Sequence, residues 1–127
     1  MSDKFIVEII SPDHTILKQE TDEVIIPSFE GQMGILNNHI PLITFLRPGI
    51  IIIKAEREKK FYVEEGTVEF SNNNLLILTS TARDLANFDK SKINEMLQEA
   101  EAKLNTESTD KDRYIASYKL ETLKEIS

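Results

Sequence analysis

The first half of the chain alternates short apolar runs with turn residues, a pattern that predicts β-strands. In residues 5–10, positions 5, 7 and 9 share one face, as the two-residue period of a strand requires. Many short strands separated by Gly, Pro, Asn and Asp are typical of an antiparallel sandwich or barrel. We predict strands at residues 5–10, 15–18, 23–26, 35–36, 42–46, 50–53, 61–63, 68–70 and 75–78.

Two of these strands have distinctive ends or faces. Pro27 follows the third strand, and we expect it to close that strand because proline has no backbone N–H to donate. Residues 50–53 are four consecutive isoleucines, which predicts a strand that is buried on both faces.

The end of the chain follows a helical period instead. Residues 85–127 contain neither Gly nor Pro. Asp89 is a plausible N-cap for a first helix, and Thr109, with Asp112 three residues later, resembles a capping box for a second. We predict that residues 105–108 connect the two helices. The first helix carries an apolar stripe at helical spacing, made of Ile93, Met96, Leu97, Ala100 and Leu104.

Together these patterns predict the fold class and the domain boundaries. Residues 1–84 form an N-terminal all-β antiparallel sandwich, and residues 85–127 form a C-terminal α-helical hairpin of two antiparallel helices. Residues 27–49 hold three of the four glycines and three of the four prolines. Because these residues restrict the backbone tightly, we expect this stretch to present a shaped surface to a partner.

Composition and charge narrow the function classes. The chain has 127 residues, of which 40% are hydrophobic and 29% charged, as in ordinary globular proteins. The net charge of −7 argues against binding to nucleic acid, which requires a basic surface. There is no cysteine, and therefore no disulfide or thiolate chemistry. We see neither a signal peptide nor a membrane-spanning segment, and expect no direct membrane span.

No group of residues suggests catalysis. We interpret His14 as a solvated turn histidine and His39 as a hydrogen-bonded loop residue, since no second His and no Cys is near either one in the sequence. Gly31 and Gly34 are not followed by the helix and lysine of a phosphate-binding loop. We therefore expect no catalytic residues, no cofactor and no metal, and interpret the chain as a binding or regulatory module.

The stretch at residues 27–49, rich in Gly and Pro, resembles a known family. Residues 30–44, EGQMGILNNHIPLIT, and 46–49, LRPG, resemble the signature of the epsilon subunit of F-type ATP synthase. The resemblance spans the full length in the same order. Further matching segments are residues 7–12, 65–70, 74–78 and 81–82.

The resemblance implies a function and its partners. Such a subunit is a non-catalytic part of the rotor, in which the sandwich binds the gamma subunit of the central stalk and rests on the loops of the c-ring. Proton flow is thereby coupled to ATP synthesis. By this analogy, the loop around residues 28–32 and the His39 turn lie together at the end that faces the c-ring, with Glu30, Gln32 and His39 as the expected contacts.

The resemblance also implies a regulatory role and a location. In many members the helical hairpin either folds on the sandwich or extends into the alpha/beta catalytic head, where it blocks ATP hydrolysis. The last helix here is not strongly basic, so we expect mild inhibition. The expected location is a peripheral membrane complex on the cytoplasmic face of the bacterial plasma membrane, because no presequence is visible; a plastid-encoded copy remains an alternative.

The chain departs from the family pattern at several positions. Asn37 stands where the family often has Pro, which makes that turn less rigid. Glu65 replaces the first Gly of a pair, which argues against a positive φ there. Some members bind ATP through an (Ile/Leu)-Asp-x-x-Arg-Ala motif. Here Asp89 is retained, but Lys92 replaces the Arg and cannot reproduce its forked donors, so we predict weak or no ATP binding.

A second interpretation needs no resemblance. The chain would be a free-standing β-sandwich module with a helical tail that senses a ligand or nucleotide. It predicts a concave apolar pocket and a monomer without a large partner, whereas the rotor interpretation predicts co-purification with a large ATPase. An enzyme is the weakest interpretation, because no base–nucleophile pair is visible.

Overall fold

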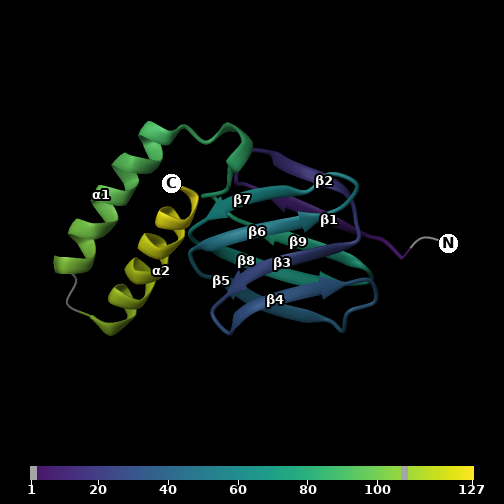
Figure 1. Cartoon of the computed structure of the whole chain (residues 1–127). Coiled ribbons are helices and arrows are strands. Elements are labelled where there is room, and N and C mark those ends of the chain that lie inside the picture. The colour runs from purple at the N-terminus through teal and green to yellow at the C-terminus, as the bar shows by residue number, and fades with distance from the viewer. Residues whose placement is uncertain (1–2, 107–108) are drawn as a thin grey trace. The chain divides into compact units, whose positions relative to one another are not determined.

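The computed structural model describes residues 3–106 and 109–127. The chain divides into two compact units, Met1–Leu85 and Ala86–Ser127. The first contains all the strands and the second the two long helices (Figure 1). The sandwich followed by a helical hairpin confirms the predicted fold class.

The strands fall close to the predicted runs, and most extend beyond them by one to several residues. A two-residue strand, β10, follows the last predicted one. The strands are β1 (Phe5–Ile10), β2 (Thr15–Thr21), β3 (Glu23–Ser28), β4 (Gly31–Leu36), β5 (Leu42–Leu46), β6 (Gly49–Lys54), β7 (Lys59–Val63), β8 (Gly66–Ser71), β9 (Asn74–Leu78) and β10 (Arg83–Asp84).

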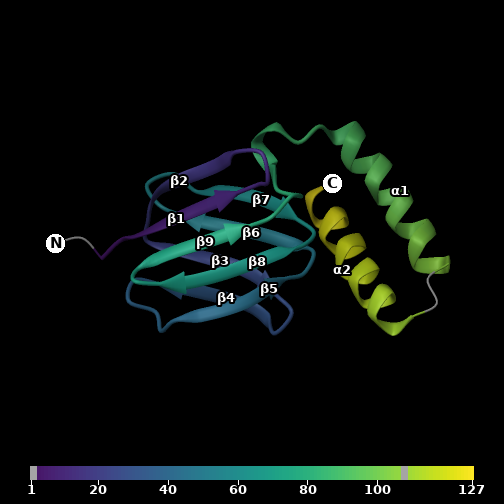
Figure 2. The ribbon, with the colours of Figure 1, turned by 180° about the vertical axis from the view of Figure 1, so that it is seen from behind.

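The strands form two layers that are joined along one side. One layer has the order β10-β7-β6-β3, with β4 on the far side of β3, and it faces the viewer in Figure 1. The other has the order β5-β8-β9-β1-β2 and faces the viewer in Figure 2. The layers are continuous where Ser28 of β3 pairs with Leu46 of β5. The resulting edge, bounded by β4 and β5, is where the predicted partner residues lie.

One strand pair departs from the predicted antiparallel pattern. β1 and β9 run parallel, with Val7 opposite Leu75 and Ile9 opposite Ile77, whereas the other pairings are antiparallel. These strands come from opposite ends of the β unit, and their pairing closes the second layer between two local hairpins.

The core lies between the layers. Alternate residues of each strand point inward, and each fully buried Ile, Val, Leu or Phe contributes about 1.5–3 kcal/mol of transfer free energy. This burial supplies most of what holds the sandwich together. The core residues are Phe5, Val7, Ile9, Val24, Ile26, Ile35, Leu46, Ile51, Ile53, Phe61, Val63, Val68, Phe70, Leu75 and Ile77.

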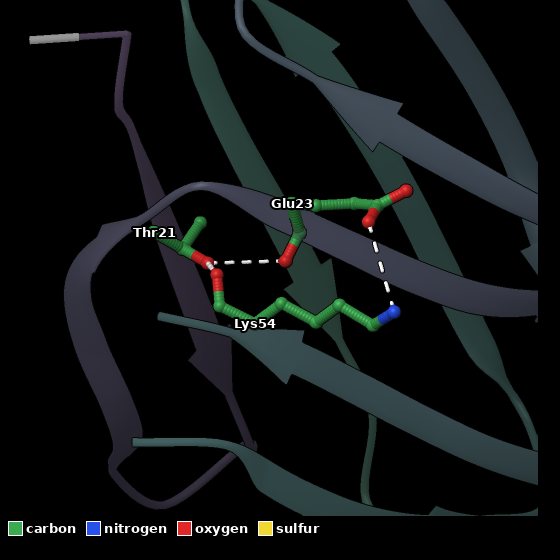
Figure 3. A network of polar contacts seen from close by, with 3 residues as sticks. All are labelled: Thr21, Glu23 and Lys54. Atoms are coloured by element: carbon green, nitrogen blue, oxygen red, sulfur yellow. Dashed lines mark hydrogen bonds and ion pairs between the residues drawn. The ribbon is translucent and has the colours of Figure 1, made fainter. Parts of the chain in front are cut away.

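A polar network fixes the corner where the chain passes from the second layer to the first. The Thr21 hydroxyl, fully buried at the end of β2, donates to the carbonyl oxygen of Lys54 at 2.8 Å (Figure 3). The Lys54 ammonium lies 3.9 Å from the Glu23 carboxylate. Thr21 thus ties the ends of β2 and β6 together without the help of a long loop.

Two expectations about the strands are wrong. Pro27 does not close the third strand but lies buried inside β3, because β3 changes neighbour there, from β6 up to Ile25 to β5 at Ser28, and no ladder bond from its missing N–H is needed. The four-isoleucine run is buried on one face only. Ile51 and Ile53 are in the core, whereas Ile50 and Ile52 are partly exposed on the outer face.

The helical unit is capped as the sequence predicts. A 3₁₀ turn, η1 (Leu85–Asn87), precedes α1 (Lys90–Thr106), and α2 (Asp110–Ile126) follows. The Thr109 side chain accepts a hydrogen bond from the N–H of Asp112 at 3.1 Å, which confirms its role as N-cap. The predicted connector begins inside α1, since Asn105 and Thr106 belong to that helix, and residues 107–108 lie outside the described residues.

The two helices pack against each other. Helices of this length are marginal alone in water, so their apolar faces must be covered to be stable. The buried side chains that serve this are Ile93, Met96, Ala100, Ala116 and Leu123.

Candidate functional site

The residues expected to contact a partner lie along the β4–β5 edge of the sandwich. β4 pairs only with β3 among the described strands, so its other side is open. Glu30 precedes β4, Gln32 lies within it, and His39 follows it. A six-residue strand therefore separates the two turns. The expectation that both turns share one end of the sandwich is wrong, and what they share is this edge.

The turn that holds Glu30 is fixed by side-chain hydrogen bonds. The buried Ser28 hydroxyl donates to the carbonyl of Gly31 at 2.7 Å and accepts from the N–H of Glu30 at 3.1 Å. Gly31 has a φ of 118°, a conformation that favours glycine. The Thr44 hydroxyl of β5 donates to the Glu30 carboxylate at 3.3 Å. The turn thus presents Glu30 in a defined position.

Two backbone hydrogen bonds join this turn to β5 across the seam between the layers. The N–H of Phe29 donates to the carbonyl of Phe45 at 3.1 Å, and the N–H of Arg47 donates to that of Pro27 at 2.9 Å. Gly49 lies against the Pro27 ring, where a Cβ would overlap the ring atoms. Close packing against Pro27 therefore explains the glycine at position 49.

The His39 turn is tied to the second layer. The Nδ1–H of His39 donates to the carbonyl of Ile40 at 2.7 Å, and its ring meets Phe70 of β8 edge to face, with 5.8 Å between centroids. This confirms His39 as a hydrogen-bonded loop residue. In the neutral ring the proton on Nδ1 leaves Nε2 as an acceptor. His39 can therefore offer one acceptor to a partner at this position.

The edge also carries apolar surface that the sequence interpretation missed. Ile40 is 75% exposed and Ile43 74% exposed, and Leu36 and Phe45 are more than half exposed. The sequence contains one signal of this surface. In residues 42–46 both odd and even positions carry apolar side chains, although only one face of β5 is buried. Exposed large apolar residues on one face indicate a docking site, and Ile43 and Phe45 share the outer face of β5.

The two residues of the degenerate ATP motif have partners at the start of α1. The Asp89 carboxylate accepts from the N–H and from the hydroxyl of Ser91, each at 3.0 Å, as an N-cap does. The Lys92 ammonium lies 3.9 Å from the carboxylate of Glu95. Both side chains thus have local partners that a bound nucleotide would have to displace.

Within residues 3–106 and 109–127, no three His, Cys, Asp or Glu side chains gather as a metal site would require. No described helix is long and apolar enough to cross a bilayer.

Comparison with known proteins identifies the family. Residues 4–84 match the family described as "ATP synthase, Delta/Epsilon chain, beta-sandwich domain". The chain belongs to this family. It is thus a member of the delta/epsilon group of ATP synthase subunits, and the matched residues end at the last strand, β10.

Full-length relatives agree with this assignment. The ATP synthase epsilon chain of Pelagibacter ubique is 45% identical over 130 residues, which cover all of both chains. The chloroplastic epsilon chain of Guillardia theta is 34% identical, over 90% of this chain and 88% of that one. These relatives support the ATP synthase interpretation over the free-standing ligand-sensing module.

Solved structures share the fold. A chain in the structure of Euglena gracilis mitochondrial ATP synthase, described as OSCP/F1/c-ring, superposes with a TM-score of 0.79 at 26% identity over 98% of this chain and 82% of that one. A chain from the Tetrahymena thermophila mitochondrial enzyme has a TM-score of 0.68 at 17% identity, over 94% of this chain and 93% of that one, which shows likeness of fold.

The departures noted in the sequence are clear in this member of the delta/epsilon family. Glu65 has no positive φ, and the glycine that follows it, Gly66, takes the φ of 155° instead. A Cβ on Gly66 would lie 2.6 Å from the carbonyl oxygen of Leu78, so the second glycine is the one that packing requires. The Pro27 and Gly49 contact lies at the family's Pro-Gly segment, which explains that glycine by packing as well.

Proposed function

We propose that this chain is a non-catalytic rotor subunit that joins the gamma subunit of the central stalk to the c-ring, so that proton flow drives ATP synthesis. Family membership and the likeness to a chain of the Euglena OSCP/F1/c-ring assembly support this assignment. The observation that carries it is the exposed apolar surface of Ile40, Ile43 and Phe45 beside two rigid polar turns. The corresponding location is the cytoplasmic face of a bacterial plasma membrane.

Two neighbouring surfaces suit two partners. On the outer face of the second layer, Phe45 of β5 and Leu78 of β9 flank Thr67 in one row, with Ile43 in the next. An apolar surface of this kind suits a partner that stays bound, and we assign it to the gamma subunit. The β4 edge, with Glu30, Gln32 and His39, is assigned to the polar loops of the c-ring.

The assignment of the edge is tested in the reassembled complex. The triple variant Glu30→Ala, Gln32→Ala, His39→Ala should lower ATP-driven proton pumping while the isolated catalytic head hydrolyses ATP normally. Glu20→Ala is the matched control, since Glu20 is exposed on β2 at the opposite side of the second layer. Pumping at the wild-type level in the triple variant would remove this edge as the c-ring contact.

The assignment of the apolar face has its own test. Phe45→Asp places a charge on a side chain that is 58% exposed, so the folded chain should tolerate it while the gamma subunit should not. We expect loss of co-purification with the gamma subunit at unchanged thermal stability. Retained binding with Phe45→Asp and with Ile43→Asp would exclude this face.

We assign a regulatory role to the helical unit, residues 86–127. In this proposal it contacts the alpha/beta catalytic head and slows ATP hydrolysis mildly. The balanced charge of α2 supports a mild effect, because its four basic residues are matched by four acidic ones. Deletion of this unit from the assembled complex tests the role.

A further inference from the structure

Two turns meet at one end of the sandwich, at residues 36–39 and 71–74. In the first, the N–H of His39 donates to the carbonyl of Leu36 at 3.1 Å, and Asn38 has a φ of 64°. A four-residue turn with positive φ only at its third residue favours Pro second and Gly third. The chain has Asn at both positions, and asparagine holds this geometry less firmly than Pro-Gly.

The Asn73 side chain bridges both of these asparagines. Its Oδ1 accepts from the N–H of Asn38 at 2.7 Å, and its Nδ2 donates to the Oδ1 of Asn37 at 2.8 Å. The orientation of the amide follows from chemistry, since a backbone N–H can only donate and must face the carbonyl oxygen. Both halves of the carboxamide are thus used on one turn.

Asn73 is itself held firmly in place. Asn72 and Asn73 have φ values of 51° and 57°, the signature of the tight turn that joins two antiparallel strands, here β8 and β9. The Asn73 carbonyl accepts from the N–H of Ile6 in β1 at 3.2 Å. Asn73 is therefore held in place by β1, β8 and β9, and its side chain holds the turn at residues 36–39 relative to these strands.

This turn leads directly into the exposed edge. His39 packs on Phe70 of β8, so β8 and the turn that follows it hold the connection at two points, Phe70 and Asn73. Ile40, the next residue, is 75% exposed. If the hydrogen bonds of Asn73 to Asn37 and Asn38 broke, His39 and Ile40 would lose their fixed position relative to the rest of the edge.

We propose that Asn73 is a positioning residue for the partner-binding edge, and that its carboxamide replaces the stiffness that Pro-Gly would give to the turn at residues 36–39. Asn73 acts through Asn37 and Asn38 and does not itself touch the partner. The inference rests on the proposed function, since it takes the edge to be the surface that meets the c-ring.

The first experiment needs only the full chain and no partner. Asn73→Gly removes the carboxamide and suits the positive φ, so the turn between β8 and β9 should still form. Loss of both hydrogen bonds should speed amide exchange of His39 about tenfold, measured by NMR, because its turn opens more often. Exchange of Val68 and Ile77 in the core should stay unchanged. Unchanged exchange at His39 would overturn the proposal.

A rescue variant separates stiffness from simple damage. Asn37→Pro restores the preferred residue at the second position of the turn, where Leu36 is already extended at the end of β4 as a residue before proline should be. In the double variant Asn73→Gly, Asn37→Pro, exchange of His39 should return to within about threefold of wild type. Failure of the proline to restore it would also count against the proposal.

The second experiment reads the consequence in the complex. Asn73→Gly should lower ATP-driven proton pumping, and Asn37→Pro in the same chain should recover it. His39→Ala distinguishes the two levels of inference. If His39→Ala lowers pumping but Asn73→Gly does not, the positioning role is wrong. Pumping could instead stay unchanged in all three variants: the triple edge variant, His39→Ala and Asn73→Gly. The proposed function of the edge would then be wrong, and so would the role of Asn73 in docking, which depends on it.

Discussion

The hydroxyl of Thr21 lies 2.8 Å from the carbonyl oxygen of Lys54, at the corner where the second layer passes into the first (Figure 3). The same hydroxyl reaches the carbonyl of Glu23 at 3.1 Å, and the Thr21 side chain is fully buried. Replacing it by Val keeps the shape and removes the donor. We expect Thr21→Val to lower the free energy of unfolding by about 1–2 kcal/mol.

The loss of stability in Thr21→Val stays moderate because the Lys54 carbonyl still accepts a hydrogen bond from the N–H of Asp22, at 2.9 Å. Urea unfolding of the full chain measures it as a shift in midpoint at unchanged slope. Thr67→Val is the matched control, since Thr67 is exposed in β8 and β-branched residues suit strands equally. Equal stability of the two variants would show that the corner does not depend on Thr21.

Gly49 is required by packing and not by its backbone angle. A Cβ at this position would overlap the Cβ of Pro27 and lie 2.8 Å from its Cγ. Because Pro27 is rigid and buried in β3, it cannot give way easily. We expect Gly49→Ala to lower the free energy of unfolding by about 1–3 kcal/mol, the cost of overpacking a core. Thermal unfolding followed by circular dichroism measures it.

Gly34→Ala is the control for this effect. At Gly34 the nearest atom to an added Cβ is the carboxylate oxygen of Glu23 at 3.0 Å, the mobile end of a side chain that is partly exposed. We expect a change below about 0.5 kcal/mol there. A larger loss at Gly34 than at Gly49 would contradict the packing explanation.

Much of the fold could be predicted because its signals are local. Alternation at residues 5–10 and caps at Asp89 and Thr109 depend on neighbours within a few residues, and the structure confirms them. The parallel pairing of β1 with β9 depends on residues about seventy positions apart, such as Val7 and Leu75, and no local pattern encodes it.

The candidate site was harder to predict for a similar reason. Only residues 35–36 of β4 are strongly apolar, so the strand looked short and the Glu30 and His39 turns looked adjacent. β4 extends back to Gly31 because its backbone pairs with β3 through Gln32, whose side chain is exposed, and through Gly34, which has no side chain to bury. The hydrogen bonds of the Asn73 side chain join two turns that are distant in sequence, so no local sequence pattern predicts them.

Tyr62 should make the stability of the sandwich fall at alkaline pH. Its hydroxyl donates to the Glu64 carboxylate at 2.9 Å, and burial, followed by the charge of Glu64, raises the pKa of Tyr62 well above its ordinary value of 10.0. Above that pH the unfolded chain releases the tyrosine proton and the folded chain retains it. The free energy of unfolding should therefore fall by up to about 1.4 kcal/mol per pH unit from this group.

Tyr62→Phe isolates the contribution of this group. At pH 7 the variant should be less stable by about 1 kcal/mol, because the hydrogen bond to Glu64 is lost. Above pH 10 the difference should shrink and then reverse, since the variant has no proton to release. Urea unfolding at pH 7, 9 and 11 measures both curves, and parallel curves over this range would show that Tyr62 ionises alike in both states.

The isolated chain should bind ATP weakly or not at all. The Asp89 carboxylate caps α1 through Ser91, and Lys92 offers a point charge, near Glu95, instead of the forked donors of arginine. On α2, which packs against α1, Ile115 is apolar and the Thr122 hydroxyl donates to the carbonyl of Tyr118 at 2.7 Å, so neither offers a cation to a phosphate. Isothermal titration calorimetry with Mg-ATP should give no heat of binding in the micromolar range.

A single substitution should not restore nucleotide binding. Lys92→Arg returns one forked donor to α1, but the apolar Ile115 and the bonded Thr122 remain on α2, so we expect no heat of binding from this variant either. Micromolar binding by the wild-type chain would show that Lys92 suffices. Micromolar binding by Lys92→Arg alone would show that α2 contributes nothing.

Removal of residues 86–127 should raise ATP hydrolysis by the assembled complex only modestly. The core of the sandwich lies wholly within Met1–Leu85, so the shortened chain keeps what holds it together. On α2 the cations Lys111, Arg113, Lys119 and Lys124 are balanced by acidic neighbours, which limits its attraction to an acidic partner. Exposed ion pairs contribute about 0.2–1 kcal/mol each, so we expect a rise of about fivefold or less.

The steady-state rate of ATP hydrolysis measures this rise, with Arg113→Gln in the full chain as the control for charge alone. A rise of about a hundredfold would mean that contacts other than charge hold the hairpin in the catalytic head, and no rise would mean that the hairpin does not inhibit.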